Sequence, residues 1–287
     1  MAAAFAPMAP SQFTQAPSLR SQGSNRAPTA TSLLMMARKP VIAGNWKMNP
    51  ETMEEAMKLG KAIKEQAAGQ DKAEVLLCAP SPFLNSMAEE LKGSNVQLGA
   101  QSVYFEDKGA FTGAVSTSML KSVGVTAVLA GHSERRVVFK NDDTAVNRKT
   151  LKILEAGMDC MLCIGESKEK YEGKLAEHIC ATQLSKDLKG VTKEQMKRVI
   201  IAYEPVWAIG TGLVCKSSDA QAIHEYVRKW LTVLYDQETA DNTRVLYGGS
   251  VTPDSVDELM AMPDIDGCLV GGASLDAEKF GRIINYK

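Results

Sequence analysis

A glutamate stands directly after a short apolar run in the C-terminal half of the chain. Residues 198–202 are rich in β-branched side chains and predict a buried strand, which would end at Glu204 and stop at Pro205. An isolated carboxylate is costly to bury, so a glutamate at a strand end indicates a role beyond packing, such as proton transfer. On this stretch alone, an ordinary strand-to-helix loop with a capping glutamate fits equally well.

The segment after Glu204 has an apolar middle and a glycine-containing end. Bulky apolar side chains give such a loop a body, and glycines give it a hinge. We therefore predict a lid that closes beside the glutamate. It would comprise Pro205, Val206, Trp207, Ala208, Ile209, Gly210, Thr211 and Gly212.

Other polar residues follow other apolar runs. Asn45 and Lys47 come after the first run, and His132 comes after the run at residues 126–131. His132 would begin a helix, whose dipole disfavours imidazolium and lowers the histidine pKa, leaving a neutral hydrogen-bond donor. A lysine usually lies on a solvated face, so Lys47 carries little weight by itself. His178 and His224 fall within charged helical stretches and are predicted to lie on the surface.

Two glycine pairs follow the last two apolar runs. Gly248 and Gly249 precede Ser250, and Gly271 and Gly272 follow the final run. Glycine lets backbone amides approach an anion closely, and in a closed barrel these positions commonly bind phosphate. A base, a neutral donor, a cation and a phosphate site together predict proton abstraction beside a carbonyl in a small phosphorylated molecule.

Eight apolar runs, each followed by a helical stretch, organise the chain from residue 40 onward. The predicted strands are residues 41–45, 74–79, 96–101, 126–131, 158–164, 198–204, 244–248 and 266–270. The predicted helices are residues 51–68, 82–92, 117–123, 142–156, 171–188, 218–236, one that opens at 252, and 277–285. This alternation predicts an α/β fold, a closed eight-stranded parallel (β/α)8 barrel formed by one domain at residues 37–287. An open doubly wound sheet, the alternative, would normally carry a glycine-rich fingerprint after its first strand, and this chain has none there.

Composition excludes several other classes of protein. The net charge of −1 with scattered lysines argues against nucleic-acid binding, and no apolar run is long enough to span a membrane, so we expect a soluble protein. Six cysteines without disulfide-like spacing indicate a reducing compartment. Cys160 and Cys163 resemble a metal or redox pair, but in a strand residues three apart face opposite sides. We therefore predict that both pack in the core, without a metal.

The N-terminal segment differs from the rest. Its first 50 residues contain no Asp or Glu, and they are rich in Ala, Ser, Thr and Pro with a few arginines such as Arg20 and Arg26. This composition predicts a transit peptide over residues 1–36, of the plastid type because prolines disfavour an amphipathic mitochondrial helix. The expected location is the chloroplast stroma, with the mitochondrion as the alternative. A disordered tail that is retained is a second interpretation.

Five motifs, taken together, resemble those of the triosephosphate isomerase family. They occur in the family's order at residues 45–49, 131–136, 202–212, 247–250 and 269–274, and the resemblance extends from about Arg38 to the C-terminus. It implies a TIM barrel that interconverts dihydroxyacetone phosphate and glyceraldehyde 3-phosphate through an enediolate, without metal or cofactor, in glycolysis, gluconeogenesis and the Calvin cycle. Two other functions stay open: a different barrel enzyme for a phosphorylated sugar, and a catalytically silent binding protein.

The resemblance also implies a role for each residue. Glu204 would be the base and His132 the neutral electrophile, an assignment taken over from the family, which is itself a standard example of pKa tuning. Asn45 and Lys47 would stabilise negative charge on oxygen. Backbone amides would hold the phosphate at Gly210, Ser250, Gly271 and Gly272, and Glu166 would support Trp207.

A homodimer is implied as well. Phe111, Thr112 and Gly113 belong to a loop similar to the family's dimer-forming loop, but Ala114 stands where an acidic residue is usual. Met48 stands where plant relatives often carry cysteine, and Cys215 and Cys268 occupy positions where cysteine is unusual. Redox properties of those relatives therefore do not carry over to this chain.

Overall fold

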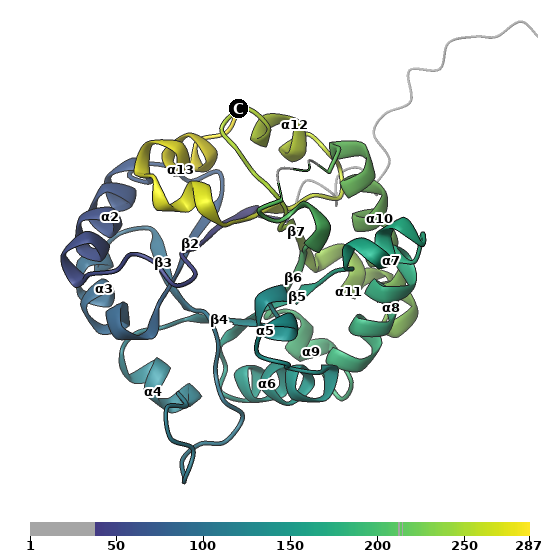
Figure 1. Cartoon of the computed structure of the whole chain (residues 1–287), viewed down its shortest axis with the longest axis horizontal. Helices are drawn as coiled ribbons and strands as arrows, with labels where there is room; N and C mark the ends of the chain where they lie inside the picture. The colour runs from purple at the N-terminus through teal and green to yellow at the C-terminus, as the bar shows by residue number, and fades with distance from the viewer. Residues whose placement is uncertain (1–37, 212, 214) are drawn as a thin grey trace, which may run out of the picture.

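The structure is a computed structural model that describes residues 38–211, 213 and 215–287 of the 287-residue chain. Within these residues, parallel strands close into a barrel in sequence order, and β1 pairs with both β2 and β8 (Figure 1). The strands are β1 (Val41–Asn45), β2 (Glu74–Ala79), β3 (Val96–Ala100), β4 (Ala127–Ala130), β5 (Asp159–Ile164), β6 (Val199–Tyr203), β7 (Arg244–Tyr247) and β8 (Gly267–Val270). The prediction of a closed barrel rather than an open sheet is confirmed. The predicted transit peptide and Gly212 lie outside the described residues.

Helices form a ring around the strands (Figure 1). The larger ones are α2 (Met53–Gln66), α3 (Leu84–Leu91), α6 (Asp143–Glu155), α8 (Ala176–Asp187), α10 (Ser217–Leu234) and α13 (Ala277–Ile284). Shorter ones are α4 (Thr117–Ser122), α5 (Ser133–Val137), α7 (Lys168–Glu172), α9 (Lys193–Met196), α11 (Gln237–Asn242) and α12 (Val256–Met260), with single 3-10 turns η1 (Ser81–Phe83), η2 (Val206–Ala208) and η3 (Gly272–Leu275). Side-chain caps from Thr52, Asp142 and Asp276 start α2, α6 and α13. No helix in this part of the chain is long and apolar enough to cross a membrane.

The long helix predicted over residues 171–188 is wrong, because the chain breaks it into α7 and α8. Gly173 caps α7, and Lys174 adopts a φ of 56°, in the left-handed region that an α-helix cannot include. The helix predicted to open at Thr252 begins later, at Val256 in α12. Two short helices, α9 and α11, fall in no predicted helix, because a segment of four or six residues shows little helical period in the sequence.

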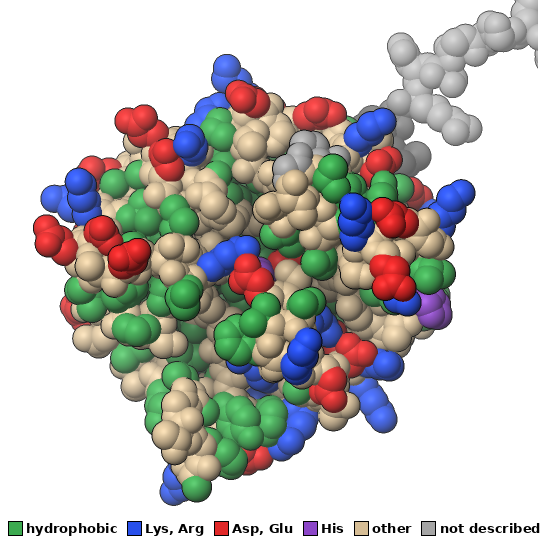
Figure 2. Space-filling model, in the orientation of Figure 1, with side chains coloured by type: hydrophobic (Ala, Val, Ile, Leu, Met, Phe, Trp, Pro, Cys, Tyr) green, Lys and Arg blue, Asp and Glu red, His purple; other side chains and the backbone are tan. Residues whose placement is uncertain are grey.

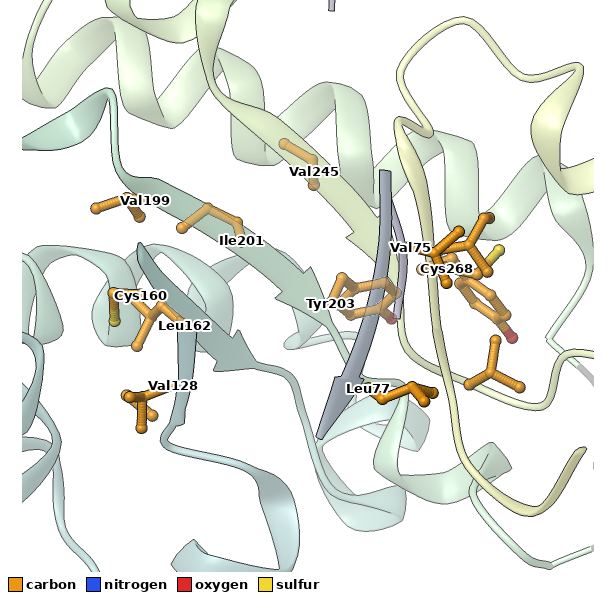
Figure 3. Packing of buried hydrophobic residues seen from close by; sticks show 14 of the residues in the cluster. Val75, Leu77, Val128, Cys160, Leu162, Val199, Ile201, Tyr203, Val245 and Cys268 are labelled. Atoms are coloured by element: carbon orange, nitrogen blue, oxygen red, sulfur yellow. The ribbon is translucent and has the colours of Figure 1, made fainter. Parts of the chain in front are cut away.

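Alternating strand residues build two apolar layers. In β6, Ile200 and Ala202 point into the barrel, whereas Val199, Ile201 and Tyr203 point outward. Figure 3 shows outward residues of several strands in the layer beneath the helices. Cys160 belongs to the outer layer and Cys163 to the inner one, so the two thiols face opposite sides as predicted. All six cysteines are free and buried.

His224 is not a surface residue, contrary to the sequence-based prediction. Its side chain, on α10, is 0% exposed, with Nδ1 3.2 Å from the carbonyl oxygen of Asp264. Burial lowers the pKa of His224 to about 4. The spacing of Ala220, His224, Val227 and Leu231 is the apolar period of a helix, a signal that the charged neighbours concealed. His178 is exposed, as predicted.

Candidate active site

A cavity of about 760 Å³ opens among the loops that follow β1, β4, β6, β7 and β8. It lies where the carboxyl ends of parallel strands meet, the face on which barrel proteins carry their sites. The structure brings eight of the predicted residues to this one cavity, and they are Asn45, Lys47, His132, Glu204, Gly210, Ser250, Gly271 and Gly272. Phe111, Thr112 and Gly113 do not line it.

The carboxylate of Glu204 is almost fully buried. Its side chain follows β6 and is 2% exposed. One oxygen, Oε2, accepts a hydrogen bond of 2.8 Å from the Ser133 amide, and the other, Oε1, lies 2.9 Å from Nε2 of His132. These two bonds replace water and hold the carboxylate against the first turn of α5.

Backbone geometry makes room for this glutamate. A Cβ atom at Gly165 would lie 1.8 Å from the Glu204 carbonyl oxygen, and one at Gly248 would lie 3.0 Å from Glu204 Cγ. Only glycine fits at Gly165, where φ is also +156°. The ends of β5 and β7 therefore press against Glu204 from both sides.

His132 is the N-cap residue of α5. Its Nδ1 accepts a hydrogen bond of 3.2 Å from the Glu134 amide, so the proton of the neutral ring is on Nε2, which points at Glu204. Burial lowers the pKa of His132, but the charge of Glu204 and the hydrogen bond to it raise the pKa above its ordinary value. The lowered pKa that we expected from the helix start is therefore wrong for this arrangement. The Glu204 carboxylate 2.9 Å away, together with the charge of Glu134, raises the pKa by more than burial and Lys47 lower it.

Lys47 extends from an unusual backbone position. Its φ of 55° is in the left-handed region, which a non-glycine residue adopts only when its surroundings enforce it. The Lys47 amide donates to Oδ1 of Asn45 at 3.0 Å, and Gln101 donates to the Lys47 carbonyl at 2.7 Å. The ammonium forms an ion pair of 2.6 Å with Glu134. Asn45 and Gln101 thus fix the direction of the Lys47 side chain.

The glycine pair after β8 lies under that side chain. A Cβ atom at Gly271 would lie 3.5 Å from Cε of Lys47, and one at Gly272 would have no heavy atom within 4 Å. Open space beside a cation and glycine amides, at the start of η3, suits an anionic group. Among residues 38–211, 213 and 215–287, no group of three potential metal-ligating side chains comes together.

The segment after Glu204 rests on a second buried carboxylate. Trp207 Nε1 donates a 2.7 Å hydrogen bond to Oε1 of Glu166, and the Tyr203 hydroxyl donates to the same oxygen at 3.1 Å. The ring of Tyr171 stacks on Trp207 with centroids 4.1 Å apart. The predicted contact between Glu166 and Trp207 is therefore present, while Ile209 and Gly210 face the cavity.

Sequence reasoning missed three residues that hold the site together. Ser133 binds Glu204 through its amide, Glu134 pairs with Lys47, and Gln101 binds the Lys47 carbonyl. Ser133 and Glu134 directly follow His132, so their position after β4 was the available signal. Gln101 follows β3, which also marked it as a residue of this face.

The fold and the cavity define a (β/α)8-barrel protein with a buried carboxylate, a histidine and an anion site, as expected of an enzyme for small phosphorylated substrates. The sequence profile of the family "Triosephosphate isomerase" matches residues 40–287. Proteins named triosephosphate isomerase from Lactobacillus acidophilus and Herpetosiphon aurantiacus are 45% and 47% identical, covering 88% and 87% of this chain and 100% of each relative. One from Finegoldia magna is 44% identical over 87% of this chain and 99% of the relative. The chain belongs to the triosephosphate isomerase family.

The contact with Glu204 makes the His132 pKa testable. Replacing Glu204 with Gln removes the charge that raises this pKa and leaves burial as the dominant cause, so the pKa should fall below the ordinary histidine value. Two-dimensional NMR of 15N-labelled histidines in the wild type and in E204Q measures the shift.

His224 provides an internal control, because its pKa of about 4 should be the same in both proteins. An unchanged or raised His132 pKa in E204Q would show that the carboxylate does not control this ring.

Proposed function

We propose that this chain interconverts dihydroxyacetone phosphate and glyceraldehyde 3-phosphate, with Glu204 and His132 as the proton-transferring pair. The observation that carries this is the 2.9 Å approach of the Glu204 carboxylate to His132 Nε2 in a cavity that also holds Lys47. The names of the relatives supply the substrate class, since all three are triosephosphate isomerases. Membership of this family argues against a different barrel enzyme.

Glu204 acts first as a base. It removes a proton from the carbon that carries the hydroxyl beside the carbonyl, and the C–H electron pair moves to form an enediolate. His132 moves a proton from the hydroxyl oxygen to the former carbonyl oxygen, and return of the carbon-bound proton from Glu204 to the neighbouring carbon completes the exchange of ketone and aldehyde, with no net oxidation. To reach the substrate carbon, the carboxylate has to leave Ser133 and His132, which occupy both its oxygens in this structure.

The departure of Glu204 also prepares His132. With the carboxylate gone from its ring, burial favours the neutral form, and Nε2–H can donate to the carbonyl oxygen. Nδ1 continues to accept from the Glu134 amide, which fixes the ring. Asn45 and the Lys47 ammonium stabilise the charge that develops on oxygen.

The substrate phosphate binds where the loops after β7 and β8 line the cavity. Backbone amides of Ser250, Gly271 and Gly272 form the cradle, Gly210 adds another when the lid closes, and Lys47 balances the charge. The lid, residues 205–212, excludes water from the enediolate, which would otherwise lose its phosphate. Family resemblance implies that no metal or cofactor takes part.

We further propose a homodimer. Apolar side chains are exposed near the projecting segment between β3 and α4 (Figure 1) and after α5, with Phe111 at 40% and Phe139 at 59%. Phe111, Thr112 and Gly113 would pack against a second copy near its Lys47.

Basic and acidic side chains are mixed on the face of the molecule that Figure 2 shows. This face therefore offers no uniformly basic patch for nucleic acid.

The remaining proposal concerns the ends of the chain. Residues 37–287 would be the catalytic domain and residues 1–36 a transit peptide, with the plastid as destination and the Calvin cycle among its pathways. The acid-free composition of the segment and the start of the family match at residue 40 support this division.

Kinetics test the assigned base and acid. Glu204→Asp withdraws the carboxylate by one methylene and should slow turnover by roughly 10²-fold or more. His132→Gln should slow turnover by roughly 10² to 10⁴-fold. Glu172→Asp, at an exposed glutamate of α7, should leave turnover unchanged. Near-normal turnover in a folded E204D or H132Q would exclude that residue from the mechanism.

The dimer is tested by sedimentation equilibrium. Wild type should be a dimer at assay concentration, and Phe111→Asp should weaken it by roughly tenfold or more, because a charge cannot fill an apolar interface pocket. Leu175→Asp is a matched control, since Leu175 is also 40% exposed but lies between α7 and α8. A fully active monomer would contradict the proposal.

Intact-mass analysis of protein from its native organelle tests the transit peptide. We expect a mature N-terminus near residues 36–38, because the transit peptide predicted over residues 1–36 would be cleaved off there. Mature protein that still contains Arg20 would refute the cleavage. Mature protein cleaved as expected but purified from mitochondria would refute the plastid assignment alone.

A further inference from the structure

Arg136 joins the loop that carries His132 to neighbouring parts of the fold. It lies in α5, and its guanidinium makes four hydrogen bonds. Nε donates to the Gly131 carbonyl at 2.7 Å, Nη1 to Asp143 at 2.8 Å, and Nη2 to the Cys163 carbonyl at 3.1 Å and to Oδ2 of Asp187 at 2.5 Å. Arg136 therefore links the carboxyl ends of β4 and β5 to α6 and α8.

The guanidinium is packed directly against the residue before His132. A Cβ atom at Gly131 would lie 2.7 Å from Nη2 of Arg136 and 3.1 Å from the Cys163 carbonyl oxygen. Gly131 also has a φ of +72°, which turns the chain from β4 into α5. A shift of the guanidinium would therefore move Gly131, and with it the backbone that sets the direction of the His132 ring.

Two carboxylates hold this guanidinium, and they differ in environment. The side chain of Asp143 is 26% exposed and also pairs with Lys186, whereas that of Asp187 is 0% exposed at the end of α8. Oδ1 of Asp187 is buried without a hydrogen-bond partner in the described part of the chain. A buried carboxylate with one unsatisfied oxygen is costly.

A second side chain of α8 supports the same face. Gln183, one turn before Asp187, accepts from the Gly165 amide at 2.8 Å and donates to the Gly165 carbonyl at 3.2 Å. Gly165 in turn packs against the backbone of Glu204. Gln183 of α8 thus supports the backbone beside Glu204. Asp187 of the same helix supports, through Arg136, the backbone beside His132.

We propose that Asp187 is a positioning residue: by holding Arg136 it fixes Gly131 and the His132 ring in the geometry required for proton transfer. This inference rests on the proposed role of His132. Asp187 touches neither substrate nor reacting atoms, so its effect passes entirely through Arg136.

The environment of Asp187 makes its effect depend on pH. Burial raises the pKa of Asp187 to about 7, opposed by the charge of Arg136. Asp187 interacts electrostatically with charged or titratable groups on four elements. These groups are Arg136 of α5, Asp143 of α6, Lys186 of α8 and Cys160 of β5. Below about pH 7 the carboxyl group takes up a proton, and its charge-assisted bond to Arg136 becomes a weaker neutral one.

The sign of the linked stability follows from the raised pKa. The folded state binds this proton more tightly than the unfolded chain, so Asp187 reduces stability as pH rises from its ordinary pKa through about 7. The ionised carboxylate therefore holds Arg136 most firmly in the pH range where it stabilises the fold least. A residue kept only for stability would not have this property.

Asp187→Asn, which keeps the shape but not the charge, tests the inference. Turnover with dihydroxyacetone phosphate is measured from about pH 5.5 to 9, using kcat because diffusional encounter limits kcat/KM in the most efficient enzymes. The ratio of wild-type to D187N kcat should be near one below about pH 6 and about tenfold above pH 8, since misplacement by a fraction of an ångström costs this much. KM should stay within about twofold, because the phosphate site is untouched.

Asp143→Asn is the matched control, because it removes the less buried carboxylate from the same guanidinium. Its kcat ratio to wild type should not vary with pH. A D187N ratio that is constant across the pH range, or a D143N ratio that varies in the same way, would overturn the inference.

Arg136→Lys provides a second test that does not depend on the folding of D187N. Lysine keeps the charge beside Asp187 but cannot bind the Gly131 and Cys163 carbonyls at once, so its kcat should fall by about tenfold at pH 8. Because that loss does not depend on the protonation state of Asp187, it should persist at pH 6, and a near-normal kcat in folded R136K would count against the inference. An inactive wild type would refute the proposed function instead, so the two failures are distinguishable.

Discussion

The constraint on which the site depends is the burial of one carboxylate at the end of β6. Glu204 keeps its charge out of water only because the Ser133 amide and His132 Nε2 replace water at its two oxygens. Both donors come from the start of α5, so the turn from β4 into α5 has to be held in place. Gly131 shapes that turn and Arg136 fastens it. The geometry of His132 is therefore inseparable from the burial of Glu204.

Two carboxylates contact His132 and Lys47, the side chains in the cavity that we expect an anionic substrate to contact. Glu204 contacts His132, and Glu134 contacts Lys47. The Glu134 side chain is 46% exposed, so water can replace its contact at little cost when a phosphate approaches Lys47. Glu204 is buried, so it would leave His132 only for another partner that replaces both of its contacts. Under the proposed function, release of the two carboxylates would therefore accompany substrate binding.

Much of the fold followed from local pattern, because each strand is a short apolar run and each main helix has its own period. The closed barrel and the position of Asn45, Lys47, His132 and Glu204 at strand ends could be predicted for this reason. The pKa of His132 could not, since it depends on a carboxylate 72 residues away in sequence, at 2.9 Å in space. Arg136 was hidden for the same reason, because its partners come from four separate segments.

Two buried acids outside the barrel interior support the parts of the site that must be held or moved. Glu166 holds Trp207 of the lid, and Asp187 holds Arg136 beside His132. Burial raises the pKa of both acids, so the fold disfavours the charged forms that make the strongest bonds. A neutral amide or an apolar side chain would cost less to bury at either position. The two acids contact Trp207 in the predicted lid and Arg136 beside His132, a placement that supports the proposed role of Asp187 in orienting the site rather than in stabilising the barrel.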